Sequence, residues 1–250
     1  MKTEGDTDTC LITGSTLLPG NKLILADLGN YKVKLVNLQT SRVTAELKTS
    51  SKPWDIASIS GDTVAVTVPD SRKIVIVKVT DQLRLDRELP VDGECHAVVH
   101  SNGNLIVSYI NPSKIEIMSL DGKSKRKIAH SESFRCPWYM ALSHDNKSVY
   151  VSDEDGDCVT RLSMDGVVQE TYEDVELDEP SCVVSVGQQG RLLVCGYDSD
   201  NIHLLEPGLT QGKVLLQMID SPYSLSYCHS TGRLYVGMRI YDNIEVYQLS

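Results

Sequence analysis

The chain has 250 residues, of which 41% are hydrophobic and 23% charged, and 34 acids against 24 Lys and Arg residues give a formal net charge of −10. This composition is typical of a folded globular protein and excludes collagen and intrinsic disorder. At this length the chain can bury a sizeable core, as two domains of roughly 100–150 residues or as one large all-β or α/β domain. The acidic balance disfavours electrostatic nucleic-acid binding, because phosphate contacts need clustered Lys and Arg.

Membrane, secretion and disulfide signals are absent from the sequence. No apolar run approaches the roughly 20 residues that cross a bilayer, and the residues after Met1 contain no apolar signal-peptide core. These observations favour a cytosolic or nuclear chain, and we predict a cytoplasmic location. The seven cysteines are an odd number without CxxC spacing, which is typical of reduced, mostly buried thiols rather than of disulfides or a zinc site.

A turn followed by a short apolar strand recurs along the chain in steps of 41, 42, 43, 44 and 42 residues. The turns begin at Gly20, Gly61, Gly103, Asn146, Gly190 and Gly232. A second apolar run follows each of these strands, and a further run, opened by proline in four units, precedes each turn. A weaker fourth run completes five of the six units. Four strands every 40–45 residues is the spacing of a β-propeller.

We therefore predict an all-β, six-bladed β-propeller of four-stranded blades that forms a single domain over residues 1–250. The blades are expected at roughly 12–52, 53–94, 95–135, 136–178, 179–220 and 221–250. The sixth unit shows no fourth run before Ser250. The N-terminal segment 7–12 is therefore predicted to supply that strand and to close the ring.

The segment from Leu25 to Val36 resembles the NHL repeat, whose signature is an apolar strand ending in Asp, then Asn, a basic residue and a second apolar strand. Residues 151–159 and 242–246 echo this signature. The whole chain from about Cys10, including segments 12–14 and 65–69, is similar to the C-terminal propellers of tripartite-motif (TRIM-NHL) E3 ubiquitin ligases.

The resemblance implies a propeller that selects proteins for ubiquitination or, in some family members, binds RNA. The sequence contains no RING finger, B-box or coiled coil. We therefore expect a recognition module that is not itself an enzyme, with any ligase activity residing in a RING domain outside this chain.

The order of strands in a propeller sorts the loops onto two faces. We call one the acidic face: it comprises the connections between blades and the loops between the second and third strands of each blade. It carries 19 acids against eight bases in our assignment, whereas the opposite, basic face carries eleven bases against six acids. The acidic face is expected to attract a Lys- or Arg-rich protein segment. The alternative is that its charge only maintains solubility.

Large aromatic residues start several innermost strands on the acidic face, and both tryptophans occupy the same repeat position. Trp and Tyr anchor many interfaces, and their rings can hold a cation. We predict that a protein or basic peptide binds here. The predicted partner-binding residues are Trp54, Asp55, His96, Trp138, Tyr139, Tyr223, Asp153, Asp155, Asp157 and Asp198. The alternative is that the Pro-Trp pairs only wedge neighbouring blades together.

Two other functions are considered. RNA could bind the basic face through Lys123, Lys125, Arg126 and Lys127, although this run is more simply an exposed hairpin turn. A metal-dependent lactonase or lyase would need several ligands at the channel, and the sequence offers Asp55 and His96 without a third. Residues 153–157 resemble a calcium loop but lack its Gly and its final Glu. We expect no cofactor, no metal, no membrane contact and a monomeric propeller.

Overall fold

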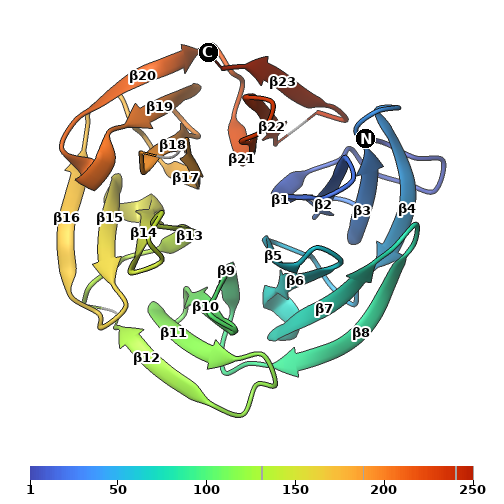
Figure 1. Ribbon diagram of the computed structural model, residues 1–250, viewed down its shortest axis with the longest axis horizontal. Coiled ribbons are helices and arrows are strands. Elements are labelled where there is room, and N and C mark those ends of the chain that lie inside the picture. Colours follow the sequence, from blue (N-terminus) through green and yellow to red (C-terminus); the bar gives the residue numbers. More distant parts are fainter. Residues whose placement is uncertain (131, 188, 240, 250) are drawn as a thin grey trace.

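In the computed structural model the chain is described except for residues 131, 188, 240 and 250. Six antiparallel sheets stand around a central axis, with the innermost strand of each sheet facing that axis (Figure 1). This arrangement confirms the predicted six-bladed β-propeller. Within the described residues the helical structure is confined to three single turns, and no helix could span a lipid bilayer.

The first three blades follow one another along the chain. Blade 1 contains β1 (Ile12–Leu18), β2 (Lys22–Asp27), β3 (Lys32–Asn37) and β4 (Arg42–Lys48). Blade 2 contains β5 (Ile56–Ser60), β6 (Thr63–Val68), β7 (Lys73–Val79) and β8 (Leu83–Pro90). Blade 3 contains β9 (Cys95–Ser101), β10 (Asn104–Tyr109), β11 (Lys114–Ser119) and β12 (Lys125–Ala129).

The last three blades complete the ring. Blade 4 contains β13 (Pro137–Leu142), β14 (Ser148–Asp153), β15 (Cys158–Ser163) and β16 (Val168–Glu173). Blade 5 contains β17 (Pro180–Val186), β18 (Arg191–Gly196), β19 (Asn201–Leu205) and β20 (Gly212–Gln217). Blade 6 contains β21 (Pro222–Cys228), β22 (Arg233–Met238) and β23 (Ile244–Gln248).

The core lies between neighbouring blades, so the second strand of a blade is buried on both sides. In β6 the residues Thr-Val-Ala-Val-Thr-Val are buried at every position. This burial explains why the second strands read as nearly continuous apolar runs rather than as a polar and apolar alternation. Proline begins β13, β17 and β21, where its missing N–H costs no ladder hydrogen bond.

The seven cysteines are all free thiols, and five of them are buried. The burial of these five agrees with the expectation that most of the cysteines are buried. Burial raises the pKa of Cys95 to about 12, so its thiol stays protonated at neutral pH.

The predicted N-terminal strand 7–12 is wrong: the sixth sheet has three strands in the described chain, and within this segment only Ile12 belongs to a strand, β1. The segment is held across the acidic face instead. The Asp8 N–H donates to Asn30 at 3.1 Å, and the Cys10 N–H donates to Asp242 at 2.8 Å. These side-chain acceptors satisfy backbone groups that a strand beside β23 would have used, which is why the segment does not pair there.

Candidate functional site

Aromatic side chains from five blades meet at the axis on the acidic face. The Trp54 ring lies 4.8 Å from that of His96 and 4.9 Å from that of Trp138, and the His96 and Trp138 rings stack at 5.0 Å. Tyr223 joins them 6.1 Å from Trp54, and Tyr197 lies 5.4 Å from Tyr223. We call these five residues the aromatic cluster.

The local strand pattern places these rings. The backbone N–H of Trp54 donates to the Thr67 carbonyl at 2.9 Å, which extends the pairing between the first two strands of blade 2 beyond the start of β5. Trp138 and Tyr223 each follow the proline that starts an innermost strand. The same position in several blades points to the same axis, so a repeat in the sequence becomes a convergence in space.

Tyr197 and Arg239 were not among the predicted site residues. Tyr197 directly precedes Asp198 in the loop between the second and third strands of blade 5. The Arg239 guanidinium lies 5.3 Å from the centre of the Tyr197 ring and donates a hydrogen bond to its hydroxyl. No repeat signal could have found Tyr197, because only one blade carries an aromatic residue there. Arg239 shows that this cluster already accommodates a cation.

A pocket of about 300 Å³ opens beside the cluster. Its walls include the rings of Trp54, His96 and Tyr223 together with the charged residues Asp70, Glu94, Lys52 and Arg239. Burial lowers the pKa of His96 to about 4, so its ring is neutral at physiological pH. A neutral aromatic wall can face a cation without charge repulsion.

Two indole N–H groups in the cluster lack a regular partner within the described part of the chain. Trp54 Nε1 is buried without a hydrogen bond, and Trp138 Nε1 faces the Tyr223 hydroxyl outside normal hydrogen-bond geometry. Leaving a buried donor unpaired costs about 1–3 kcal/mol. The aromatic cluster bears this cost itself, because solvent does not reach either nitrogen.

Asp55 and Tyr139 lie below the aromatic cluster, and their side chains join different blades of the propeller. The Tyr139 hydroxyl donates to the Thr13 carbonyl at 2.6 Å, joining blade 4 to blade 1 across the axis. The Asp55 carboxylate accepts the N–H groups of Ile56 at 2.8 Å and Val98 at 2.9 Å. Gly14 permits this close assembly, since a Cβ there would lie 2.7 Å from the Asp55 Cα.

Asp55 and His96 do not form a shared ligand site. Asp55 and Tyr139 line a cavity of about 290 Å³, together with Ser15, Ser58 and Ser185 from the innermost strands. His96 lines the separate pocket beside the aromatic cluster, and its Nδ1 lies 3.2 Å from the Glu94 carbonyl. The two-ligand metal site considered from the sequence therefore gains no support from this geometry.

The predicted acids of blades 4 and 5 fall into two groups. Asp153 is buried, and its carboxylate accepts the N–H groups of Arg135 at 2.9 Å and Cys136 at 2.6 Å. Asp157 is exposed and accepts the Glu179 N–H at 3.1 Å. Both carboxylates thus tie a loop to a connection between blades. Asp155 and Asp198 are exposed.

Asp155 and Asp198 form an acidic cluster with Glu154 and Glu179, neither of which was predicted as a site residue. Burial, together with the charges of Glu179, Asp155 and Asp198, raises the pKa of Glu154 to about 7. Burial and the charge of Asp198 also raise the pKa of Glu179. These carboxyl groups resist ionisation because they repel one another once charged. A cation that approaches them relieves this repulsion and is attracted to the cluster.

The four predicted RNA-binding residues are exposed but do not lie in one turn. Lys125, Arg126 and Lys127 belong to the outer strand β12, where consecutive side chains point to opposite sides. Lys123 forms an ion pair with Asp121 at 3.5 Å, and Lys125 forms one with Asp92 at 3.1 Å. Part of the positive charge is therefore already neutralised.

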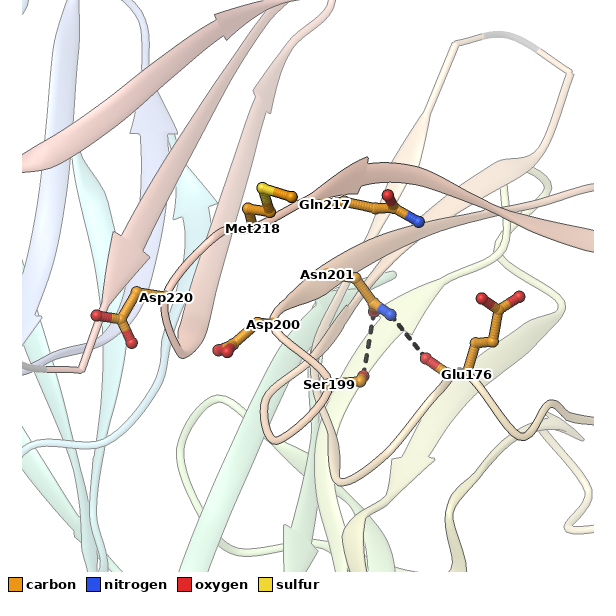
Figure 2. A pocket seen from close by; sticks show the side chains of 7 residues that line it. All are labelled: Glu176, Ser199, Asp200, Asn201, Gln217, Met218 and Asp220. Atoms are coloured by element: carbon orange, nitrogen blue, oxygen red, sulfur yellow. Dashed lines mark hydrogen bonds between the residues drawn. The ribbon is translucent and has the colours of Figure 1, made fainter.

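A second hollow on the acidic face, shown in Figure 2, has a volume of about 610 Å³. It lies at blade 5 and is lined by Glu176, Ser199, Asp200, Asn201, Gln217, Met218 and Asp220. The Asn201 amide donates to the Glu176 carbonyl at 2.7 Å, while the Met218 side chain is almost fully exposed. This hollow contains three of the carboxylates of the acidic face without bringing them together in a ligand site (Figure 2).

A mostly buried group of metal-type ligands lies between the N-terminal segment and blade 1, but a lysine occupies its centre. The donor atoms of Asp6, Cys10 and Asp27 lie within 4.8 Å of one another. Lys34 Nζ is 2.6 Å from both Asp6 and Asp27 and 3.4 Å from the Cys10 sulfur. Burial disfavours the charge of Asp6, yet hydrogen bonds from Lys32 and Lys34 hold its pKa well below its usual range. The ammonium group supplies the positive charge that a metal would bring.

No protein-family model matches the chain, and no curated protein matches its sequence significantly. The fold has many structural relatives. Hydrazine synthase of Kuenenia stuttgartiensis matches with a TM-score of 0.76 and 14% identity over 100% of this chain and 99% of that chain. Streptogramin B lyase matches with a TM-score of 0.71 and 15% identity over 97% of this chain and 84% of that chain.

A chain in a nidogen/laminin complex matches with a TM-score of 0.73 and 18% identity over 87% of this chain and 85% of that chain. At these identities the relatives show the propeller fold alone, because one propeller fold serves enzymes and binding proteins alike. They do not confirm the resemblance to tripartite-motif ligases.

Proposed function

We propose that this propeller is a protein-recognition module that binds a basic peptide or protein segment on its acidic face, and that it selects substrates as part of a tripartite-motif-like ubiquitin ligase. It acts by binding and has no catalytic role of its own. The convergence of aromatic rings from several blades beside like-charged acids carries this proposal. The structural relative in the nidogen/laminin complex is consistent with protein binding.

The aromatic cluster and the acidic cluster act together in this proposal. The charge of Glu154 contributes, after burial, to raising the pKa of Tyr223, so the two clusters lie within electrostatic reach. A Lys or Arg side chain could place its charge over a Trp or Tyr ring while acids neutralise it, an interaction worth about 0.5–2 kcal/mol.

The proposal is tested by capture from a nuclease-treated cell lysate on the immobilised propeller. Wild type is compared with Trp54→Ala and with the double charge reversal Asp155→Lys/Asp198→Lys, whose exposed sites keep the fold intact. Tyr31→Ala is the matched control, because Tyr31 is an exposed aromatic outside the aromatic cluster. Captured proteins and RNA are both measured, with thermal melts of every variant.

Protein capture that persists after nuclease, falls in both site variants and is retained by Tyr31→Ala supports the proposal. Direct binding is then measured with a labelled lysine-rich peptide. Capture that is unchanged in the charge reversal and in folded Trp54→Ala would overturn it. RNA capture indifferent to Trp54 would instead move the function to the basic face.

A further inference from the structure

The sixth blade leaves one strand edge open. Its third strand, β23, pairs with β22, and no other described strand pairs with it. The Leu249 N–H donates to the Gly232 carbonyl at 2.9 Å. Because inward and outward groups alternate along an antiparallel strand, the N–H and C=O groups of Ile244, Val246 and Gln248 point away from β22. The Val246 side chain is 53% exposed at the middle of this edge.

An apolar groove lies where a fourth strand of blade 6 would pack. In blade 2 the outer strand β8 contacts β3 and β4 of the preceding blade. By the same arrangement, a strand added to β23 would lie against β19 and β20 of blade 5. There Leu204, Leu215 and Leu216 are half-buried and line a groove of about 330 Å³. These leucines are the side chains that an added strand would cover.

The two ends of the position that a fourth strand of blade 6 would occupy carry opposite charges. A strand antiparallel to β23 would begin near Gln248 and end near Ile244. Exposed Lys213 and Arg233 lie at the first end, on the basic face. Asp220 and Glu245 lie at the second end, on the acidic face. The charges therefore favour a strand that begins with acids and ends with basic residues.

The position of the edge favours a single strand over a second propeller. β23 lies between the outer strands β20 of blade 5 and β4 of blade 1 (Figure 1). A segment added to β23 would take the place that an outer strand holds in the other five blades, whereas a second copy would have to bring its neighbouring outer strands into the same space.

We propose that a partner protein adds an extended strand antiparallel to β23 and so completes the sixth blade. This strand begins with acidic residues, alternates apolar and small polar residues, and ends with basic residues. Its backbone pairs with Ile244, Val246 and Gln248, and its apolar side chains enter the groove beside Leu215 and Leu216. The site lies at the rim and is separate from the aromatic cluster, so it does not depend on the function proposed above.

The test measures fluorescence polarisation of a labelled synthetic peptide of about nine residues, enough to span one strand edge. The peptide carries two acids, a leucine and threonine alternation and two lysines. A control peptide exchanges the acids with the lysines. Val246→Pro removes the central outward N–H, and Leu216→Asp charges the groove. Val168→Pro is the matched control, since Val168 is an exposed valine on the outer strand β16.

We expect the folded wild type to bind the first peptide about tenfold more tightly than the exchanged peptide. Binding should fall about tenfold in Val246→Pro and in Leu216→Asp but stay unchanged in Val168→Pro. Hydrogen exchange at Ile244, Val246 and Gln248 should slow when the peptide binds. Circular dichroism confirms that each variant is folded.

Three results would overturn the proposal. The first is that folded wild type binds neither peptide. The second is that both peptides bind equally or that Val246→Pro binds as wild type does. The third is a dimer in sedimentation velocity that Val246→Pro dissociates, because the edge would then belong to a second copy of this chain.

Discussion

Two pairs of consecutive residues, Trp54 with Asp55 and Trp138 with Tyr139, differ sharply in what their side chains do. The tryptophans lie half-buried in the aromatic cluster, and their indole N–H groups lack regular hydrogen bonds in the described chain. Asp55 and Tyr139 are buried and bond to strands of other blades through Val98 and Thr13. Consecutive side chains of an extended strand point in opposite directions, so neighbouring positions separate the aromatic cluster, where we propose partner contact, from the contacts that join the blades.

The largest effect is expected for Tyr139, whose side chain crosses the axis. Tyr139→Ala should lower the free energy of unfolding by about 3–5 kcal/mol, because it leaves a cavity at the centre of the ring. Tyr139→Phe should lower it by about 1–2 kcal/mol through loss of the bond to Thr13. Urea unfolding measures both values. A stable Tyr139→Phe variant that lost peptide binding would show that Tyr139 also takes part in binding, contrary to this comparison.

Asp55 should make stability depend on pH. Burial raises its pKa from 3.8 to about 6 in the folded state, so the folded protein holds a proton there that the unfolded chain has already lost. The resulting stabilisation is complete below pH 3.8 and is lost as the pH rises through 6, by about 3 kcal/mol.

Urea unfolding at several pH values checks this sign. Relative to Asp55→Asn, wild type should lose stability between pH 4 and 6.5. A constant difference between the two proteins across this range would show that the carboxyl ionises as freely in the folded state as in the unfolded chain.

Trp54 should affect binding more than stability. Trp54→Ala should weaken binding of a lysine-rich peptide by at least about tenfold, as expected for an aromatic anchor at the centre of an interface. Its loss of unfolding free energy should be smaller than that of Tyr139→Ala, since the Trp54 side chain is half-buried and Tyr139 is fully buried. Titration calorimetry and urea unfolding of the same samples compare the two effects. A larger loss of unfolding free energy in Trp54→Ala than in Tyr139→Ala would contradict the proposed difference between the two neighbouring positions.

The smallest effect is expected at Glu154. With a pKa of about 7, raised first by burial, this carboxyl gains its charge as the pH rises from 6 to 8. Binding of a lysine-rich peptide should therefore strengthen by about threefold over this range. Glu154→Gln should remove the dependence, with Asp165→Asn on the basic face as the control. An unchanged pH profile in Glu154→Gln would exclude Glu154 from the site.

Parts of the site could be predicted because they repeat. Trp54, His96, Trp138 and Tyr223 occupy equivalent positions in four blades, and the ring symmetry brings them together. Tyr197 belongs to one loop of one blade and left no periodic signal. Asp153 looked like an available acid, yet its carboxylate is bound to two backbone N–H groups. Loop composition does not distinguish an acid that stabilises a loop from one that faces a partner.

The spacing of turns and apolar runs by itself determined the six-bladed ring, because each unit must bury both sides of its second strand against a neighbour. Only the tertiary structure decided how the ring closes. Asp6 pairs with the buried Lys34, and Asp242, in the loop before β23, accepts the N–H of Cys10, so the N-terminal segment joins blades 1 and 6 through side chains and not as a described strand of the sixth sheet. Such contacts join residues far apart in the chain, and their geometry depends on where the folded blades place each charge.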